Sequence, residues 1–450
     1  MTEKMKPSRI GWIKDIPESW KTSKVKFLAT EPDTLFLDGD WIESDVIEET
    51  GIRYLTSGNV GAGFYKDQGS GYISEKTFRE LHCLKVFPGD LMISRLNEPI
   101  GRACIVPEGE PCYVVAVDNV ILRPNKEYDR KFIMYAMNTE GYAEHGNMIA
   151  RGATMSRVSR SQLGQFWLAF PGISEQRAIA DFLDSQCAKI DSVIADLEKQ
   201  IETLQKYKKS LITEAVTKGL DRSVPMKESG IVWIGNVPEH WHLKRLKFML
   251  ENSSDSMKVG PFGSALSGSD FTDEGKWVYN QRVVLDKNFS ENTTFISEEK
   301  YREMQGFSVY PGDILITTRG TIGKVAIVPE GAQEGILHPC IIKFRVDKEM
   351  MMPELLELIF NESDFVKDQF TLMSNATTIE VIYSYSLKDI ILPVIPAEEQ
   401  KKIYSYLSEK CETIDAVIME KHKALSAITQ HKKSLIYEYV TGKKRVTEVN

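Results

Sequence analysis

The most constraining feature of this sequence is a heptad pattern of apolar residues that occurs twice. The first copy runs from Ser174 to Gly219 and the second from Glu398 to Gly442. Apolar residues alternate at steps of three and four, which is the seam of a coiled coil, so each copy predicts one long helix. The predicted seam residues are Ile190, Ile194, Leu197, Ile201, Leu204 and Leu211 in the first copy, and Ile414, Ile418, Leu425, Ile428 and Leu435 in the second.

Both predicted helices carry similar end signals. Each copy has Lys-Lys-Ser-Leu-Ile near its end and stops at a glycine, Gly219 or Gly442, the residue type favoured just past a helix. We expect the first helix to start with Ser174 as its N-cap and Glu175 in its first turn. A helix of about 40 residues spans about 60 Å, so it is expected to run between domains. The alternative is two amphipathic helices buried in one ordinary core.

The rest of the chain is duplicated as well. The opening segment 12–20, with tryptophan at both ends, returns at 233–241, and Pro-Gly-Asp turns recur at 88–90 and 311–313. Each turn leads into strand-like runs, then a helical stretch (131–144 and 353–370), a polar loop and a last strand before the long helix. The chain is therefore predicted to be a tandem repeat of one globular part and one helix.

Connectivity predicts an α+β fold in which two similar mixed α/β domains are joined by two long helices. The second helix has to run antiparallel to bury its seam on the first, which would make the molecule pseudo-two-fold symmetric. The predicted boundaries are 1–170 and 223–394 for the domains, and 171–222 and 395–450 for the helices, the last with a tail. Two such domains suit two inverted half-sites on duplex DNA, with the helices setting the separation.

Composition limits the class of protein. The apolar fraction is 42% and the charged fraction 27%, both ordinary for a globular chain, and no apolar run approaches the ~18 residues of a membrane span. The N-terminus has no apolar stretch typical of a secretory signal, and the six cysteines do not occur in pairs at the spacing of a metal site. We therefore expect a reduced, cytoplasmic protein without a membrane partner. The net charge of −8 counts weakly against DNA binding, because clustered charge matters more than the sum.

The usual catalytic motifs are missing from the sequence. It has no phosphate-binding loop, no Asn-Pro-Pro-aromatic tetrad, no G-x-S-x-G elbow and no H-E-x-x-H pair. His240 and His242 flank Trp241 and read as surface or packing residues, and Asp38-Gly-Asp40 reads as a turn rather than a cation site. We therefore expect no catalytic residue, no metal and no cofactor on this chain.

If the domains read DNA, polar loop residues that can reach base edges are the candidates. In the first domain these are Arg53, Ser57, Asn59, Arg95, Asn97, Arg151, Thr154 and Arg157; in the second they are Ser264, Asn280, Gln281, Arg282, Arg319, Thr321, Asn375 and Thr378. Nearby lysines would contact phosphates, which position a protein on DNA without specifying sequence.

These motifs together resemble the specificity (S) subunits of type I restriction-modification enzymes. The resemblance covers nearly the whole chain and rests on the paired openings, the Pro-Gly-Asp turns, Arg319-Gly-Thr-Ile-Gly323, the Glu-Gln pairs at 175–176 and 399–400, and Lys-Lys-Ser-Leu-Ile. In one departure, the first domain has Arg95-Leu-Asn-Glu-Pro-Ile-Gly101 where the second has Arg-Gly-x-x-Gly.

The resemblance implies a fold and a role. Two target-recognition domains would each read half of a bipartite double-stranded DNA site, and the helices would form the spacer and dock two methyltransferase subunits. Restriction (translocase) subunits can join that core to form an ATP-dependent nuclease. S-adenosylmethionine, and ATP with Mg²⁺, would be bound by the partner subunits, which carry the adenine-methylation and cleavage chemistry.

Two other hypotheses remain open at this point. A self-sufficient DNA-modifying enzyme would need a cofactor-binding glycine loop and would itself bind S-adenosylmethionine. A coiled-coil adaptor with two protein-binding end domains would show no sequence-specific DNA footprint even with its partners present.

Overall fold

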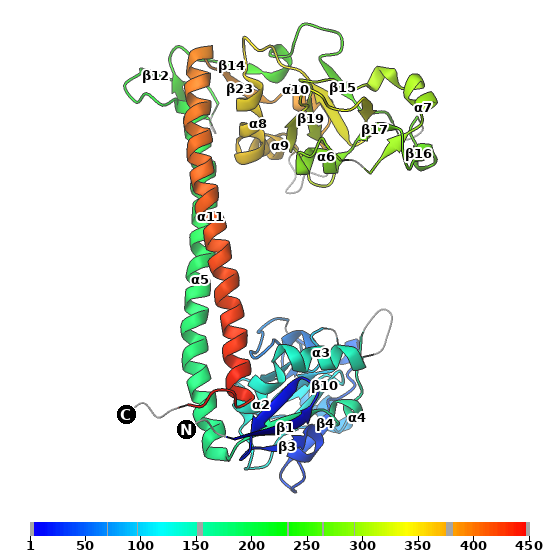
Figure 1. The fold of residues 1–450 in the computed structure, drawn as a ribbon, viewed down its shortest axis with the longest axis vertical. Helices are drawn as coiled ribbons and strands as arrows, with labels where there is room; N and C mark the ends of the chain where they lie inside the picture. The colour runs from blue at the N-terminus through cyan, green and yellow to red at the C-terminus, as the bar shows by residue number, and fades with distance from the viewer. Residues whose placement is uncertain are drawn as a thin grey trace. The chain divides into compact units, whose positions relative to one another are not determined.

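The computed structural model describes residues 4–69, 71–96, 98–150, 156–231, 234–262, 265–291, 293–374 and 381–446. The chain divides into two compact units, Met1–Leu197 with Lys423–Asn450 (unit 1) and Glu198–His422 (unit 2). Each unit contains one domain of strands and short helices and about half of each long helix, α5 (Ile173–Lys218) and α11 (Ala397–Val440) (Figure 1). The boundaries predicted from the sequence separated the domains from the long helices. In the structure, each compact unit contains one domain together with the helix halves that pack on it.

The two long helices run antiparallel within each unit. In unit 1, Asp191 of α5 pairs with Lys432 of α11 at 2.5 Å; in unit 2, Lys208 pairs with Asp415 at 2.7 Å. All eleven predicted seam residues are buried or half-buried, while most neighbouring positions on the helices are exposed. The less exposed face of each long helix therefore contains the predicted seam residues. The pseudo-two-fold symmetry of the whole molecule stays a prediction.

The helix ends follow the sequence signals with one exception. Gly219 and Gly442 lie just past the helices with a φ of +71° each, the left-handed conformation that favours glycine. Helix α5 begins at Ile173, so Ser174 lies in the first turn and the predicted N-cap is wrong. The amides of Glu175 and Gln176 both bond the carbonyl of Gly172, which starts the helix before Ser174.

Unit 1 is built around a four-stranded antiparallel sheet, β4-β10-β7-β8, and a three-stranded sheet, β6-β5-β9, in which β5 and β9 are parallel. The remaining strands form the pairs β1-β2 and β11-β3. The strands are β1 (Met5–Ile10), β2 (Ile13–Pro17), β3 (Lys21–Lys24), β4 (Leu35–Asp38), β5 (Ile52–Leu55), β6 (Tyr72–Ile73), β7 (Leu91–Ser94), β8 (Ala103–Ile105), β9 (Tyr113–Val115), β10 (Asn119–Arg123) and β11 (Trp167–Phe170). The helices are α1 (Glu75–Glu80), α2 (Arg130–Met137), α3 (Glu140–Ile149) and α4 (Arg160–Leu163).

Unit 2 repeats this plan. Its sheets are β15-β22-β19-β20 and β16-β18-β17-β21, with β17 and β21 parallel, and its pairs are β12-β13 and β14-β23. The strands are β12 (Met226–Glu228), β13 (Asn236–Pro238), β14 (His242–Arg245), β15 (Met257–Val259), β16 (Phe271–Thr272), β17 (Lys276–Tyr279), β18 (Phe295–Ile296), β19 (Ile314–Thr317), β20 (Val325–Ile327), β21 (Gly335–Leu337), β22 (Ile341–Phe344) and β23 (Ile391–Val394). The helices are α6 (Gln281–Asp286), α7 (Glu298–Glu303), α8 (Pro353–Glu362), α9 (Phe365–Ser374) and α10 (Ser384–Lys388).

The single helical stretch predicted in each domain is two helices. In unit 1 the chain breaks between α2 and α3, where the Asn138 side chain accepts from the amide of Ala103 and donates to its carbonyl. In unit 2, Asn361 makes the same two hydrogen bonds with Val325. Each asparagine thus caps the edge strand of the four-stranded sheet, β8 or β20. Such long-range hydrogen bonds leave no periodic signal in the sequence.

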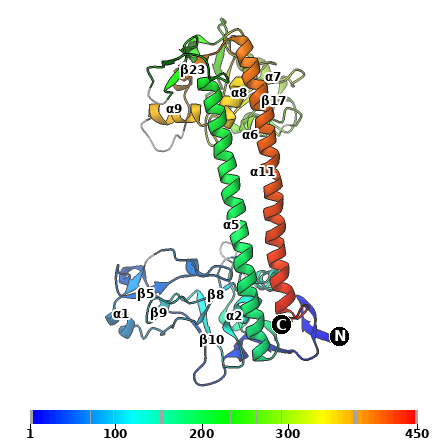
Figure 2. The ribbon, with the colours of Figure 1, turned by 90° about the vertical axis from the view of Figure 1, so that its left-hand side faces the viewer.

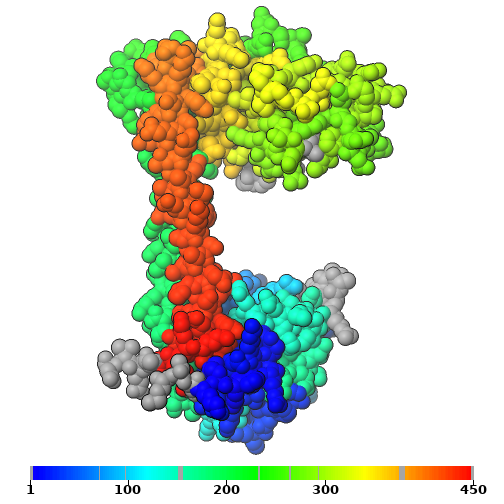
Figure 3. Space-filling view, viewed as in Figure 1, coloured from blue at the N-terminus to red at the C-terminus, as the bar shows by residue number. Residues whose placement is uncertain are grey.

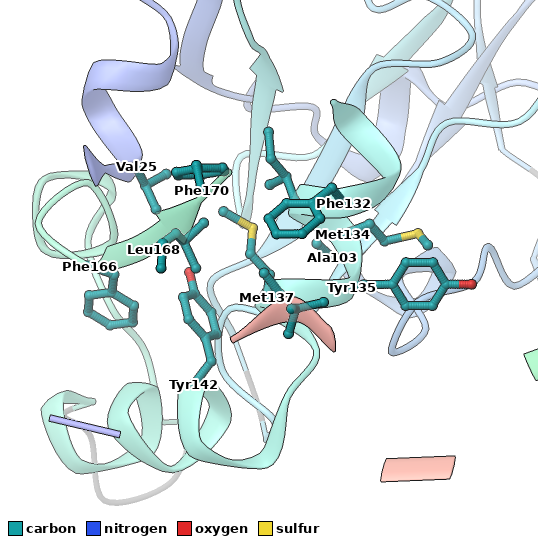
Figure 4. Packing of buried hydrophobic residues seen from close by; sticks show 14 of the residues in the cluster. Val25, Ala103, Phe132, Met134, Tyr135, Met137, Tyr142, Phe166, Leu168 and Phe170 are labelled. Atoms are coloured by element: carbon teal, nitrogen blue, oxygen red, sulfur yellow. The ribbon is translucent and has the colours of Figure 1, made fainter. Parts of the chain in front are cut away.

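The core of unit 1 joins the domain to the long helices. Figure 4 shows Phe132 of α2 and Phe170 of β11 among the buried side chains. Figure 2 shows α2 beside the N-terminal half of α5, where Tyr135 and Lys131 both bond Asp184. The end of α11 lies against the N-terminal strands (Figure 3). At that contact, a Cβ on Gly442 would overlap Pro17.

Within the described ranges, every helix is too short or too polar to cross a lipid bilayer.

Candidate nucleic-acid interface

Several polar loops of unit 1 meet at one end of strands β5, β7 and β9. We call the residues 56–59, 95–96, 98–102, 117–118 and 157–160 loop cluster 1. Arg102 connects two of its segments, because its guanidinium donates to the carbonyl of Leu96 at 3.1 Å in its own segment and to the carbonyls of Ser57 at 3.1 Å and Val60 at 2.8 Å in and just after the first. Leu96 in turn forms a β-bridge with Arg157, which brings two segments far apart in sequence side by side.

Unit 2 has the corresponding loop cluster 2, residues 280–282, 318–324, 338–340 and 381–382. Gln281 at the start of α6 donates to the carbonyl of Thr321 at 3.3 Å. Arg319 forms a β-bridge with Val381, and the Thr318 hydroxyl donates to the carbonyl of Cys340 at 2.9 Å. Equivalent segments therefore assemble at the same end of the sheet in both units.

These two β-bridges correct the sequence alignment of the loop at 95–101 with the loop at 319–323. Leu96 pairs with Arg157 as Arg319 pairs with Val381, so Leu96, and not Arg95, is the counterpart of Arg319. Both loops close with the same hydrogen bond, from Gly101 to Ser94 at 2.9 Å and from Gly323 to Thr317 at 2.8 Å. The first loop is one residue longer, which shifted the motif comparison by one position.

Loop cluster 1 is rich in arginine and partly neutralised. Asp38 pairs with both Arg95 and Arg160 at 3.3 Å, and Asp118 pairs with Arg157 at 3.0 Å. Burial lowers the pKa of Arg95, against the opposing effect of Asp38, and burial also lowers the pKa of Arg102. Guanidinium groups still remain charged at neutral pH, so these four arginines stay cationic beside Asp38 and Asp118.

Two of the predicted DNA-contacting residues in unit 1 have buried side chains that bond backbone groups of the domain. Asn59 is 3% exposed; its carbonyl oxygen accepts from the Thr56 amide at 2.8 Å, and its amide nitrogen donates to the Gln68 carbonyl at 2.7 Å. Arg95 is 6% exposed and donates to the carbonyl of Val117. The structure does not support base contacts by either side chain, because neither presents its polar atoms at the surface.

Arg53 lies apart from loop cluster 1. Its guanidinium stands 5.3 Å from the Tyr72 ring and donates to the Tyr72 hydroxyl at 3.1 Å and the Gly69 carbonyl at 2.7 Å. The hydrogen bond with Tyr72 raises the pKa of Arg53. Arg53 pairs with Tyr113 at the start of β9, whereas the cluster lies past the other end of that strand. Ser57 does lie in the cluster and is half-buried.

The described candidates of unit 2 all lie in or beside loop cluster 2. Asn280 caps helix α6 by accepting from the amides of Arg282 and Val283, and its side-chain nitrogen donates to Thr294 at 2.8 Å. Arg282 is exposed and pairs with Asp286 at 3.3 Å. The side chains of Arg319 and Thr321 are exposed.

Six candidates lie outside the described residues: Asn97, Arg151, Thr154, Ser264, Asn375 and Thr378.

The sequence analysis missed Arg102, which connects two segments of loop cluster 1. A signal was present, because Gly101-Arg102 aligns with Gly323-Lys324 and so places a basic residue after the loop glycine in both copies. Lys324 is also tied down, donating to the carbonyl of Asn361 at 2.5 Å.

The turn predicted at Asp38-Gly-Asp40 is wrong, because Asp38 ends strand β4 and Asp40 forms a β-bridge with Ala116, so the chain continues along the sheet. Asp38 pairs with two arginines, and Asp40 accepts from the amide of Leu84 at 2.9 Å. In the part of the chain that the structure describes, no group of three His, Cys, Asp or Glu side chains is arranged to hold a metal ion.

Comparison with known proteins finds similarity to one family. The model of the type I restriction modification DNA specificity domain matches residues 259–427. The match begins at the end of β15 and includes loop cluster 2 and the first part of α11.

Relatives and solved structures extend the comparison to the rest of the chain. The MjaVIII specificity subunit of Methanocaldococcus jannaschii, a type I restriction enzyme subunit, is 26% identical over 337 residues, covering 72% of this chain and 73% of its own. A chain from a structure on complex assembly and conformational transition of the type I R-M system has a TM-score of 0.69 at 14% identity, covering 95% of this chain and 99% of its own. The HsdS subunit from Thermoanaerobacter tengcongensis has a TM-score of 0.51 at 13% identity, covering 97% and 100%.

These matches confirm the resemblance to type I specificity subunits that the motifs indicated. The two structures confirm the fold, two mixed α/β domains joined by two long helices.

Proposed function

We propose that this chain is the non-catalytic DNA-specificity subunit of a type I restriction-modification complex. Each unit would read one half of a bipartite double-stranded DNA site, and the helix pair would set the separation of the halves. The observation that carries the proposal is the presence of an equivalent loop cluster in each unit, within a chain whose second repeat matches the model of a DNA specificity domain.

The chemistry of the clusters supports contact with DNA. Loop cluster 1 presents Arg157, whose side chain is 45% exposed and pairs with Asp118. Loop cluster 2 presents Arg319 and Thr321. Arginine can bond a guanine edge in two places or neutralise a phosphate, and a threonine can contact either a base or the backbone. The exposed residues differ between the units, which suits two different half-sites.

The helix pair suits a partner shared by both units. Val193 of α5 and Val417 of α11 occupy equivalent heptad positions and are 46% and 37% exposed, and Met419 is 54% exposed. Apolar side chains outside the seam favour docking of another protein on the helices. We propose that two methyltransferase subunits dock there, and that S-adenosylmethionine, together with ATP and Mg²⁺ where restriction subunits join, is bound by those partners.

Co-expression with the methyltransferase subunit, followed by mapping of methylated adenines across the host genome, tests this function. We expect methylation at one split motif with a fixed gap. A complex that forms but methylates no split motif would contradict the reading role, and a chain that binds other proteins but shows no DNA footprint would favour the adaptor hypothesis.

Two substitutions connect the function to the clusters. Arg157→Ala and Arg319→Ala should each lower methylation at the split motif, because each removes an exposed charge and hydrogen-bond donor worth roughly tenfold or more in DNA affinity. The matched control is Arg79→Ala, an exposed arginine on α1 that pairs with Glu75. Equal methylation by all three variants and the unsubstituted complex would show that the clusters are not the contact surface.

A further inference from the structure

Each unit exposes a large aromatic ring at the same place in its fold. Trp41 is 71% exposed and Phe262 is 81% exposed. Each is the third residue after the edge strand of the four-stranded sheet, β4 in unit 1 and β15 in unit 2. A single exposed ring is common on protein surfaces, but two rings at equivalent positions of a repeat indicate a shared role.

The segment that carries each ring is held in place by a glycine. The amide of Gly39 donates to the Asn119 carbonyl at 3.0 Å, and that of Gly260 donates to the Ile341 carbonyl at 2.9 Å. A Cβ on Gly39 would overlap the carbonyl of Val115, and one on Gly260 would overlap that of His338. Both segments therefore pack directly on the backbone that leads into the turn before β10 or β22.

The same contacts place each ring beside the loop cluster of its unit. In unit 1, Asp38 precedes Gly39 and pairs with Arg95 and Arg160 of loop cluster 1. In unit 2, His338, on which Gly260 packs, belongs to loop cluster 2. Burial lowers the pKa of His338, so its imidazole stays uncharged at neutral pH. Neither ring packs into a hydrophobic core of the described part of the chain.

We infer that Trp41 and Phe262 are equivalent DNA-contacting side chains, one for each half-site, and that each buries its ring against the bases or sugars at the edge of that half-site. This inference rests on the proposed function. An aromatic ring beside a cationic loop suits this position, because it can stack on a base, contact a thymine methyl or wedge at a base step. The rings differ in size, so the two units make unlike contacts through one shared position.

The test is DNA binding by the full chain in complex with its methyltransferase partner, on a duplex that carries the split site. Trp41→Ala and Phe262→Ala should each weaken binding by roughly 5- to 150-fold, the range for loss of one base–aromatic contact. Trp41→Phe and Phe262→Trp should retain most of the affinity. Footprinting should show that each alanine substitution weakens protection at only one half-site, a different one for each variant.

Matched controls come from Phe87→Ala and Tyr310→Ala. These aromatic residues are 39% and 49% exposed and also occupy equivalent positions, but they precede β7 and β19, at the opposite end of those strands from the loop clusters. All variants should keep the melting temperature of the unsubstituted complex to within a few degrees, since the substituted rings are largely exposed.

The outcomes separate the inference from the function on which it rests. If the unsubstituted complex binds the split site and the Trp41→Ala and Phe262→Ala complexes bind it equally tightly, the inference is overturned and the function stands. If the unsubstituted complex binds no split site, the proposed function fails and the inference fails with it.

Discussion

At the residue scale, two buried glutamines explain the repeated Glu-Gln pair. Gln176 accepts from the amide of Asp129 at 2.8 Å and donates to the carbonyls of Glu127 and Pro171, each at 3.0 Å. Gln400 makes the equivalent three hydrogen bonds in unit 2. Both are 1% exposed. The motif therefore fastens the start of each long helix to the segment before α2 or α8, which is a structural role.

Gln176→Ala and Gln400→Ala should each lower the free energy of unfolding by about 1–3 kcal/mol, because buried backbone groups lose their partners. Chemical denaturation followed by circular dichroism measures this change. Gln205→Ala, at an exposed position of α5, is the control and should change stability by less than about 0.5 kcal/mol. Equal stabilities for the Gln176 and Gln205 variants would show that these hydrogen bonds contribute nothing net.

At the element scale, a buried lysine interrupts the apolar seam of the helix pair. The side chain of Lys208 is 10% exposed and pairs with Asp415 of α11 at 2.7 Å and Glu362 of α8 at 2.6 Å. Burial acts to lower the pKa of Lys208, but the hydrogen bonds that it donates to Asp415 and Glu362 outweigh this effect, so the pKa is raised. One side chain thus connects both long helices to the domain of unit 2. In unit 1 the equivalent Lys432 is more exposed.

Removing the carboxylates of Asp415 and Glu362 should lower the free energy of unfolding more than removing the ammonium of Lys208. Lys208→Met keeps an apolar stem in the seam, so we expect a change in unfolding free energy of about 1 kcal/mol or less in either direction. The double variant Asp415→Ala with Glu362→Ala leaves a buried ammonium unpaired and should cost about 3–5 kcal/mol. Thermal and urea unfolding measure both changes.

The control for this prediction lies in unit 1. Asp191→Ala removes the partner of Lys432, whose side chain is 28% exposed, and should cost about 1 kcal/mol or less. If Lys208→Met proves more destabilising than the double carboxylate variant, the ion pairs themselves stabilise the seam and the prediction is wrong.

At the scale of the whole molecule, the duplication joins each repeat to the other through its long helix. Helix α5 follows the first domain and ends in unit 2, where Gly219 faces Trp241; α11 follows the second domain and ends in unit 1, where Gly442 faces Trp20. Each unit is therefore completed by a helix end that belongs to the other repeat.

A change in helix length should change the DNA site without changing its halves. Inserting one heptad into each long helix where the two units meet, after Leu197 in α5 and after His422 in α11, keeps the seam in phase and lengthens each helix by about 10 Å. At 3.4 Å per base pair, the gap of the split motif should grow by about three base pairs. Methylation mapping in the co-expressed complex measures the gap. Inserting five residues instead breaks the seam and should abolish methylation; an unchanged gap in the heptad variant would show that the helices do not set the spacing.

The sequence alone determined the features that repeat at short range. Heptad spacing predicted both long helices and every seam residue, since the burial of a helix face follows directly from its period. Turn signals predicted β7, β8, β19 and β20, and the glycines predicted both helix ends. The duplication predicted that the two units share one plan.

Only the tertiary structure decided what the polar loop residues do. Arg53, Asn59 and Arg157 look alike as loop candidates, but Tyr72 and Gly69 hold the first, backbone groups enclose the second, and the third stays exposed. Contacts between distant segments also showed that Leu96 and Arg319 occupy equivalent positions, and that Trp41 lies beside loop cluster 1. A polar side chain has no period that reports its partner, and its partner here is supplied by another segment of the fold.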